Sequence, residues 1–172
     1  MTEFTIRLLQ ADEVDTLCER AHEIWHAHYP AFIGKAQIDY MLVQRYSPES
    51  IRASLETSCW LAAWHGQAMA GFAQAFADDT PSTWKLDKLY VHPDHQRKGV
   101  GQALLGLVKQ KACDSGAIRL ILRVNKHNTL ALSAYAKYGF SFYGEDVLDI
   151  GSGFVMDDYL LEMNLCSGKS KP

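Results

Sequence analysis

Hydrophobic residues in the first part of the chain recur at helical spacing, with a short strand-like segment before them. Residues 4–8 predict a strand, and a helix is predicted over 11–28. The expected core face of this helix holds Val14, Leu17, Cys18, Ala21 and Trp25. Residues 29–34 contain a proline and a glycine that interrupt it, and a second helix is predicted over 36–45. Ser47 as N-cap and Pro48 as first helical residue then predict a third helix to about residue 56.

The rest of the chain alternates strand-like and helical patterns. A hairpin is predicted from strands 59–64 and 67–77 with a turn at His65-Gly66, followed by a loop at 78–82. Further elements are a strand at 83–91, a helix at 100–115, a strand at 118–124, a helix at 128–138 and strands near 140–149 and 154–164. This order predicts one α/β domain over residues 1–165 with a mixed sheet, and residues 166–172 are expected to form a disordered tail.

Composition narrows the class of protein. The chain has 172 residues, 48% of them hydrophobic and 22% charged, which fits one compact domain with a substantial core. A net charge of -3 argues against nucleic-acid binding. Charged residues throughout the first twenty positions leave no signal-peptide core, and no apolar run is long enough to span a membrane, so we expect a cytoplasmic protein. The cysteines lack C-x-x-C spacing and indicate small buried hydrophobes, with no metal site expected.

The most informative stretch joins the strand ending at Val91 to the helix beginning near residue 100. The first turn of a helix presents backbone N–H groups without intrahelical partners, so it binds anions well. Glycines allow close approach there and basic side chains add positive charge. The predicted phosphate-binding residues are Gln96, Arg97, Lys98, Gly99, Val100 and Gly101. The order of lysine and glycine excludes a P-loop, a dinucleotide fingerprint fits weakly, and a purely structural turn is the remaining alternative.

A second motif follows the strand at 118–124. Asn128, Ala131 and Tyr135 lie on one face of the predicted helix, and the small residue lets a ligand lie close. An ordinary core tyrosine is the alternative for Tyr135. Gly139 fits a left-handed residue after the helix, and Phe140 opens the next strand.

Together these two stretches resemble the GNAT superfamily of N-acetyltransferases. Gln96, Gly99 and Gly101 fill its Q/R-x-x-G-x-G/A pattern. Its N-x-x-A-x-x-x-Y-x-K-x-G-F pattern is filled by Asn128, Ala131, Tyr135, Lys137, Gly139 and Phe140. The resemblance is specific over residues 83 to 140.

The resemblance implies a mixed, mostly antiparallel sheet in which two parallel strands, ending at Val91 and Val124, splay apart around the pantetheine arm of acetyl-CoA. Backbone groups of Leu89, Tyr90 and Val91 would pair with that arm, and Asn128 and Lys137 would contact the cofactor. The implied reaction is direct attack of an amine on the thioester. Tyr135 would be the general acid for the departing thiolate, and an N–H near Val91 would bind the oxyanion.

The sequence indicates the general base and the acceptor site less specifically than the cofactor site. Asp87 points to the same side of its strand as Val91 and is the candidate base, with a solvated carboxylate as the alternative. The helical wall of the acceptor site, by resemblance, would include Trp25, His26, His28 and Tyr29. Asp157 and Asp158, together with Asp78 and Asp79, are expected as an acidic rim for a cationic amine, unless they only solvate loops.

The segment 149–159 resembles members of the superfamily near bacterial polyamine acetyltransferases, so a polyamine or another small cationic amine is the favoured acceptor. A protein N-terminus or an amino sugar would serve the same chemistry. A homodimer is expected by analogy. Two other classes stay open: a non-catalytic acyl-CoA-binding sensor or interaction module, and a binder of nucleotide or flavin phosphates.

Overall fold

The computed structural model describes residues 3–165, so the predicted tail at 166–172 lies outside the described residues. Within them the chain forms two compact units. The first comprises residues 3–75 and 88–108, and the second comprises residues 76–87 and 109–165. The prediction of a single domain over residues 1–165 stays a prediction.

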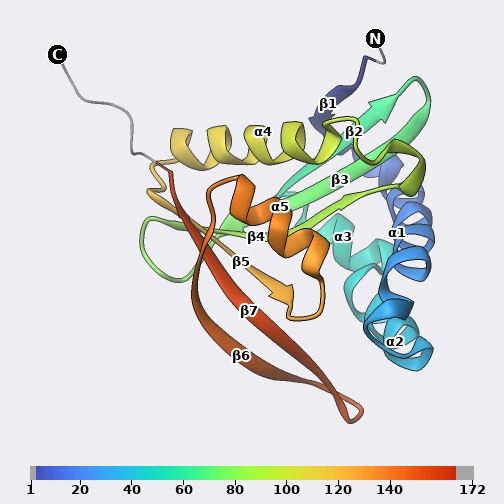
Figure 1. Cartoon of the computed structure of the whole chain (residues 1–172). Coiled ribbons are helices and arrows are strands. Elements are labelled where there is room, and N and C mark those ends of the chain that lie inside the picture. Colours follow the sequence, from blue (N-terminus) through green and yellow to red (C-terminus); the bar gives the residue numbers. More distant parts are fainter. Residues whose placement is uncertain (1–2, 166–172) are drawn as a thin grey trace, which may run out of the picture. The chain divides into compact units, whose positions relative to one another are not determined.

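The first unit contains the N-terminal helices and the antiparallel strands that follow them (Figure 1). Its elements are β1 (Thr5–Leu8), η1 (Ala11–Glu13), α1 (Val14–His28), η2 (Tyr29–Ala31), α2 (Lys35–Arg45), α3 (Pro48–Ser54), β2 (Cys59–His65), most of β3 (Ala68–Ala77), the end of β4 (Thr83–Val91), η3 (Pro93–His95) and the beginning of α4 (Val100–Asp114).

The second unit contains the beginning of β4, the end of α4 and the C-terminal elements. These elements are β5 (Arg119–Asn125), α5 (Thr129–Lys137), β6 (Ser141–Gly151) and β7 (Phe154–Asn164). β6 and β7 form a long hairpin (Figure 1).

Hydrogen bonding orders the strands as β1-β2-β3-β4-β5-β7-β6, a mixed sheet as predicted. β1 with β2, β2 with β3, β5 with β7, and β6 with β7 are antiparallel, whereas β4 and β5 are parallel. The parallel register pairs Thr83 with Arg119 and continues to Leu86 with Leu122. β4 continues to Val91 beyond this register.

The core of the first unit follows the predicted helix pattern. All five expected core residues of α1 are buried, together with Ile24. Ser47 caps α3 as predicted, because its Oγ accepts a hydrogen bond from Ser50 N at 3.2 Å. The hairpin turn lies one residue later than predicted, since β2 continues through His65 and the turn occupies Gly66 and Gln67. Gly66 there has φ +59, which glycine adopts without a steric penalty.

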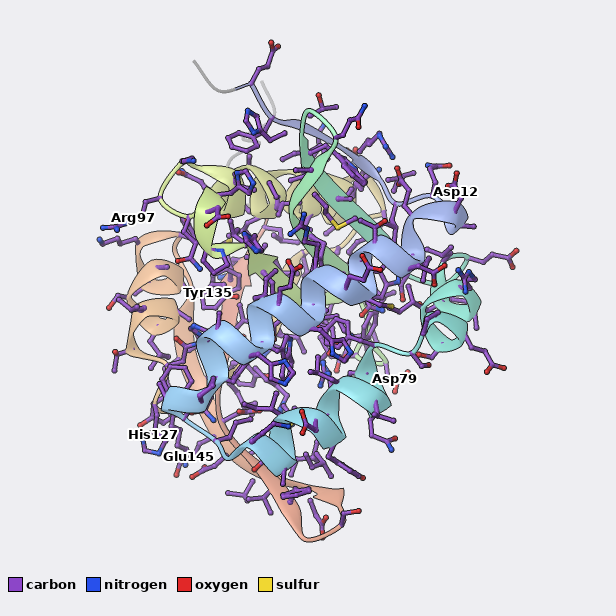
Figure 2. All side chains as sticks on the ribbon, turned by 90° about the vertical axis from the view of Figure 1, so that its right-hand side faces the viewer. Asp12, Asp79, Arg97, His127, Tyr135 and Glu145 are labelled. Carbon is purple, nitrogen blue, oxygen red and sulfur yellow. The ribbon has the colours of Figure 1, made fainter. Side chains whose placement is uncertain are left out.

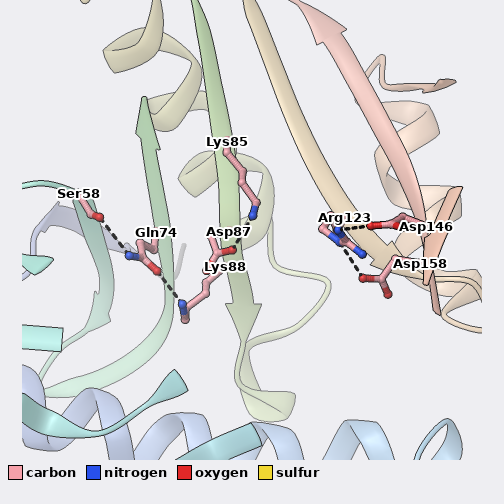
Figure 3. Close-up of polar contacts among 8 residues, drawn as sticks. All are labelled: Ser58, Gln74, Lys85, Asp87, Lys88, Arg123, Asp146 and Asp158. Carbon is pink, nitrogen blue, oxygen red and sulfur yellow. Dashed lines mark hydrogen bonds and ion pairs between the residues drawn. The ribbon is translucent and has the colours of Figure 1, made fainter. Parts of the chain in front are cut away.

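One charged side chain is buried in this core. Lys88 is 6% exposed, and its Nζ donates to Gln74 Oε1 at 2.6 Å while Gln74 Nε2 donates to Ser58 Oγ (Figure 3). The ammonium also lies over the rings of Tyr46 and Trp60, at 5.5 and 5.4 Å from their centroids. Hydrogen bonding and cation–π attraction offset the desolvation of this charge.

Candidate active site

The phosphate loop, residues Gln96–Gly101, begins directly after η3. His92 Nδ1 accepts from Asp94 N at 3.3 Å and caps that short helix. Arg97 has φ +59 and Gly99 has φ +82, so two left-handed residues alternate with ordinary ones. A turn with left-handed residues can direct backbone N–H groups toward a bound anion. The Arg97 side chain extends outward from the ribbon (Figure 2).

α4 begins at the end of this loop. Its first intrahelical bond runs from Ala103 N to Gly99 O at 3.0 Å, so the N–H groups of residues 100–102 belong to the helix turn that has no intrahelical acceptors. Lys98 Nζ donates to Asp94 O at 2.8 Å, which holds its positive charge beside the loop backbone. The positive end of the α4 dipole and the basic side chains both favour an anion here.

The phosphate loop is attached to the last residue of β4. Gln96 Nε2 donates to Val91 O at 3.2 Å. A Cβ built on Gly101 would lie 3.5 Å from Val91 Cγ2, an ordinary van der Waals distance, so packing alone does not require glycine at 101. Gly99 is different, because its positive φ disfavours any residue with a side chain.

The end of β4 is also held close to β3. A Cβ on Gly71 would lie 2.6 Å from Tyr90 O, so only glycine permits this approach. His92 N donates to Ala70 O at 2.8 Å. Gly71 was not a predicted site residue, although a glycine inside an apolar strand is the signal that could have identified it.

In the second unit, Asn128 and Ala131 form the N-terminal cap of α5. Asn128 Oδ1 accepts from Ala131 N at 3.2 Å, and the side chain is 6% exposed. Asn128 therefore has a structural role beside the cofactor contact predicted for it. Gly139 has φ +98 directly after the C-cap of α5, which confirms the predicted left-handed conformation.

Tyr135 lies on α5 and is half-buried. Its ring packs edge-on against Phe140, with centroids 5.4 Å apart. Phe140 N also donates to Tyr135 O at 3.0 Å. Lys137, two residues along, is exposed. The catalytic and cofactor roles of these residues stay predictions.

The candidate base Asp87 lies on β4 with 17% of its side chain exposed. Its Oδ1 is 3.5 Å from Lys85 Nζ (Figure 3). Lys85 and Asp87 are two residues apart, so they share one face of the strand. The carboxylate is therefore shielded from bulk solvent and beside a positive charge, which differs from a fully solvated strand carboxylate.

The four predicted acceptor-wall residues occupy different environments. Trp25 is 2% exposed and its Nε1 donates to Tyr46 OH at 3.3 Å, so it packs in the core, and its place in the acceptor wall stays a prediction. His26 is exposed and contacts Asp39 Oδ1 through Nε2 at 3.1 Å. His28 and Tyr29 are half-buried. Burial lowers the pKa of His28 and favours its neutral form.

Asp158, one of the residues expected in the acidic rim, is buried in an ion pair. It is 2% exposed, and its Oδ2 lies 3.1 Å from Arg123 Nε, while Arg123 Nη1 contacts Asp146 at 2.9 Å (Figure 3). Asp157 is partly exposed and lies 2.6 Å from Lys126 Nζ. Both carboxylates lie in β7 rather than in a loop. Asp158 is paired with Arg123 of the neighbouring strand β5, and Asp157 is paired with Lys126 in the turn after β5.

Asp78 lies in the exposed loop between β3 and β4. The hydrogen bond that Asp78 accepts from Thr80 N lowers the pKa of its carboxyl group. Asp79 follows it in the same exposed loop. Of the four carboxylates in the predicted acidic set, Asp79 is exposed, Asp78 and Asp157 are half-buried, and Asp158 is buried.

Over residues 3–165, no helix is long and apolar enough to cross a membrane, and no group of three or more metal-ligating side chains comes together.

The sequence and the fold were compared with those of known proteins. The family model described as the acetyltransferase (GNAT) family matches residues 18–140. A spermidine N(1)-acetyltransferase from Thermoplasma acidophilum is 26% identical over 158 residues, which cover 88% of this chain and 94% of that protein.

Two crystal structures share the fold. The PaiA N-acetyltransferase from Thermoplasma acidophilum in complex with coenzyme A has a TM-score of 0.81 and 23% identity, covering 94% of this chain and 99% of the other. A GCN5-related N-acetyltransferase from Rhodopseudomonas palustris has a TM-score of 0.82 and 19% identity, covering 96% and 98%.

These similarities confirm the predicted fold class and the predicted enzyme class. Because the family model spans more than half of the sequence, the chain belongs to the acetyltransferase (GNAT) family.

Proposed function

We propose that this protein transfers the acetyl group of acetyl-CoA to a primary amine by direct attack, and that its acceptor is a polyamine or another small cationic amine. The phosphate loop carries this proposal. Its two left-handed residues, its position at the start of α4 and its basic side chains form an anion site of the kind that a diphosphate requires.

The end of β4 supports the binding of the pantetheine arm. The parallel register with β5 stops at Leu86, and residues Leu89, Tyr90 and Val91 continue the strand. Their backbone groups can pair with an extended amide-containing chain as a further strand would. The N–H of Val91 is the proposed donor to the oxyanion, since a preorganised backbone donor stabilises developing charge.

The chemistry requires a neutral amine and a protonated leaving group. An alkylammonium has a pKa of about 10.4, so exposing its lone pair near neutral pH costs about 4 to 5 kcal/mol. Asp87 is the proposed base, acting through water. The nitrogen forms the new bond to the acetyl carbon, the bond from carbon to sulfur breaks, and Tyr135 is the proposed donor of a proton to the thiolate.

The preference for a polyamine is supported by the spermidine N(1)-acetyltransferase relative. Asp157 and Asp158 contribute less than expected to this preference, because Lys126 and Arg123 already compensate their charges. The half-buried carboxylate of Asp78 and the exposed carboxylate of Asp79 are the remaining candidates for attracting a cation.

A screen of acceptors tests the proposal. Spermidine, spermine, amino sugars, amino acids and short peptides are each incubated with acetyl-CoA, free thiol is measured, and mass spectrometry identifies the acetylated product. We expect the highest kcat/KM for spermidine or spermine. Faster transfer to an amino sugar or a peptide would contradict the polyamine preference. Binding of acetyl-CoA without transfer to any of these amines would favour the acyl-CoA sensor.

A further inference from the structure

The turn that joins β4 to the phosphate loop is built around His92. The Nδ1 atom of its ring accepts a hydrogen bond from Asp94 N at 3.3 Å, and its backbone carbonyl oxygen accepts one from His95 N at 2.9 Å. The backbone N–H of His92 donates to Ala70 O at 2.8 Å, which ties the turn to β3. One residue thus holds both the start of η3 and the end of β4.

The hydrogen bond at Nδ1 defines the neutral tautomer of this ring. A ring nitrogen that accepts a hydrogen bond carries no proton, so the proton of the neutral His92 ring is on Nε2. This Nε2 lies 3.3 Å from Glu23 Oε2 of α1. A carboxylate beside one nitrogen of a histidine determines which nitrogen is protonated and how the ring is oriented. Glu23 therefore favours the ring state that caps η3.

Glu23 is held in place on the surface of α1. Arg20 Nη1, one helical turn earlier, donates to the same Oε2 atom at 2.6 Å. The Glu23 side chain is 52% exposed, whereas that of His92 is only 16% exposed. The contact can therefore be removed by substitution of Glu23 without opening a buried site.

Asp94 connects the His92 ring to the phosphate loop. Its backbone N–H donates to the ring, and its carbonyl oxygen accepts from Lys98 Nζ at 2.8 Å. Gln96 N donates to Pro93 O at 3.3 Å and closes η3. The ring thus fixes the position of Asp94, and Asp94 in turn fixes the position of the Lys98 ammonium. This ammonium is one of the positive charges that the loop presents to an anion.

We propose that His92 is a positioning residue for coenzyme A binding. Glu23 holds its ring in the tautomer that accepts at Nδ1, and the ring then holds the turn after β4 and the Lys98 ammonium in the arrangement that receives the diphosphate. We call His92 and Glu23 the cap pair. The inference rests on the proposed role of the phosphate loop, and neither residue belongs to the predicted cofactor site.

The test is a double-variant cycle in which calorimetry measures the Kd of coenzyme A and thermal unfolding measures Tm. His92→Ala removes the cap. His92→Asn keeps an acceptor for Asp94 N, because asparagine is among the best N-cap residues, but it has no atom at the position of Nε2. Glu23→Ala is made in the wild-type protein and in His92→Asn. Glu19→Ala, at an exposed glutamate four residues earlier on α1, is the matched control.

We expect His92→Ala to raise the Kd about two- to thirty-fold, which is the effect of losing an N-cap, and His92→Asn to stay within about two-fold of wild type. Glu23→Ala should raise the Kd about three-fold or more in the wild-type protein, but not in His92→Asn, where no ring has to be oriented. The sign is specific, because removing a negative charge near an anion site by itself lowers the Kd.

Three results would overturn the proposal. The first is an equal change of Kd by Glu23→Ala in both backgrounds, and the second is an equal rise of Kd in Glu19→Ala. The third is a wild-type Kd with a lowered Tm in His92→Ala, which would assign the ring to stability alone.

Failure of the proposed function gives a different result. A wild-type protein that binds acetyl-CoA but acetylates no amine overturns the transfer reaction, and the Kd values of the cycle still test the cap pair because they need no acceptor. Retained affinity in Gly99→Asp overturns the phosphate loop and the cap pair together. Retained affinity in His92→Ala, with affinity lost in Gly99→Asp, overturns the cap pair alone.

Discussion

Gln96 and Val91 are joined by a hydrogen bond of 3.2 Å from the Gln96 side-chain amide to the Val91 carbonyl oxygen. This bond connects the first residue of the phosphate loop to the last residue of β4. The proposed anion site and the proposed oxyanion donor therefore hold each other in place.

Removing this bond should loosen cofactor binding without unfolding the protein. A hydrogen bond contributes about 0.5 to 1.5 kcal/mol, so Gln96→Ala should raise the Kd of coenzyme A roughly two- to twelve-fold. Calorimetry measures the Kd, and Gln110→Ala, an exposed position farther along α4, is the control. Identical Kd values for Gln96→Ala and wild type would show that the bond does not support the loop.

The left-handed conformation of Gly99 predicts a position-specific response to alanine. Gly99→Ala should cost about 1 kcal/mol or more from its positive φ and weaken coenzyme A binding. Gly99→Asp should abolish binding, since its carboxylate also repels the diphosphate. Gly106→Ala, inside α4 with open space around it, should instead stabilise the protein by roughly 0.5 to 1 kcal/mol. Retained affinity in Gly99→Asp would remove the phosphate loop from the binding site.

Tyr135→Phe separates chemistry from cofactor binding. If the phenol donates a proton to the thiolate, kcat should fall about 100-fold while the Kd of acetyl-CoA stays within about two-fold of wild type. Steady-state kinetics and calorimetry give the two values. Tyr138→Phe, at the C-cap of the same helix, is the control and should keep full turnover. Full turnover in Tyr135→Phe would return this residue to the role of a packed core tyrosine.

The buried ion pair of Asp158 predicts a loss of stability. Asp158→Asn leaves Arg123 without its buried partner, which should lower the free energy of unfolding by about 1 to 3 kcal/mol. The loss is below that of a fully buried pair because Arg123 retains 21% exposure and a second partner in Asp146. Asp157→Asn, at the more exposed pair with Lys126, should lower the free energy of unfolding less than Asp158→Asn does.

Denaturant unfolding measures the change in the free energy of unfolding for both variants. The KM for spermidine shows whether these carboxylates also attract the substrate or only form ion pairs. If Asp158→Asn raised the KM for spermidine and left the free energy of unfolding unchanged, Asp158 would belong to an acidic rim that attracts the substrate.

His28 predicts a direction for the pH dependence of stability. Burial lowers its pKa below the ordinary value of 6.5. As the pH falls through that value, the unfolded imidazole takes up a proton before the folded one, so the free energy of unfolding decreases toward the folded pKa.

His28→Asn should therefore reduce the slope of Tm against pH below about 6.5. The lowered pKa of His95, which is due mainly to its burial, leaves part of the slope in place. Equal slopes for His28→Asn and wild type would contradict the account.

The pattern of hydrophobic and polar residues was sufficient to predict most helices and strands of the fold. The strand at 83–91 has the predicted bounds, and the helix over 11–28 differs only by the 3-10 turn at its start. Boundary residues were also informative: Ser47 marks the start of α3 and Gly139 follows the end of α5, as predicted. The predicted bounds were wrong by one residue at the hairpin between β2 and β3, where the turn begins at Gly66 because this residue adopts a positive φ.

Contacts across strands could not be read from the sequence. Asp158 looked like half of an exposed acidic pair, but the antiparallel register places it opposite Asn125 and beside Arg123. Lys88 lies in a stretch of alternating charge, yet it is buried against Gln74. Both outcomes depend on strand register, which is set by residues far apart in the chain.

For the candidate site, the sequence predicted the motifs but not the contacts that their side chains make. The phosphate loop was identified by its glycines and basic residues, whereas the left-handed Arg97 has no sequence signal. Tyr90 was predicted for its backbone alone, because its hydroxyl meets Tyr29 only after the chain has folded.

The most direct measurement is a crystal structure of the protein with coenzyme A. The account predicts the diphosphate oxygens about 3 Å from backbone nitrogens of the phosphate loop, within ordinary hydrogen-bond range. Coenzyme A bound elsewhere, or a phosphate loop closed by the protein's own side chains, would contradict the central claim.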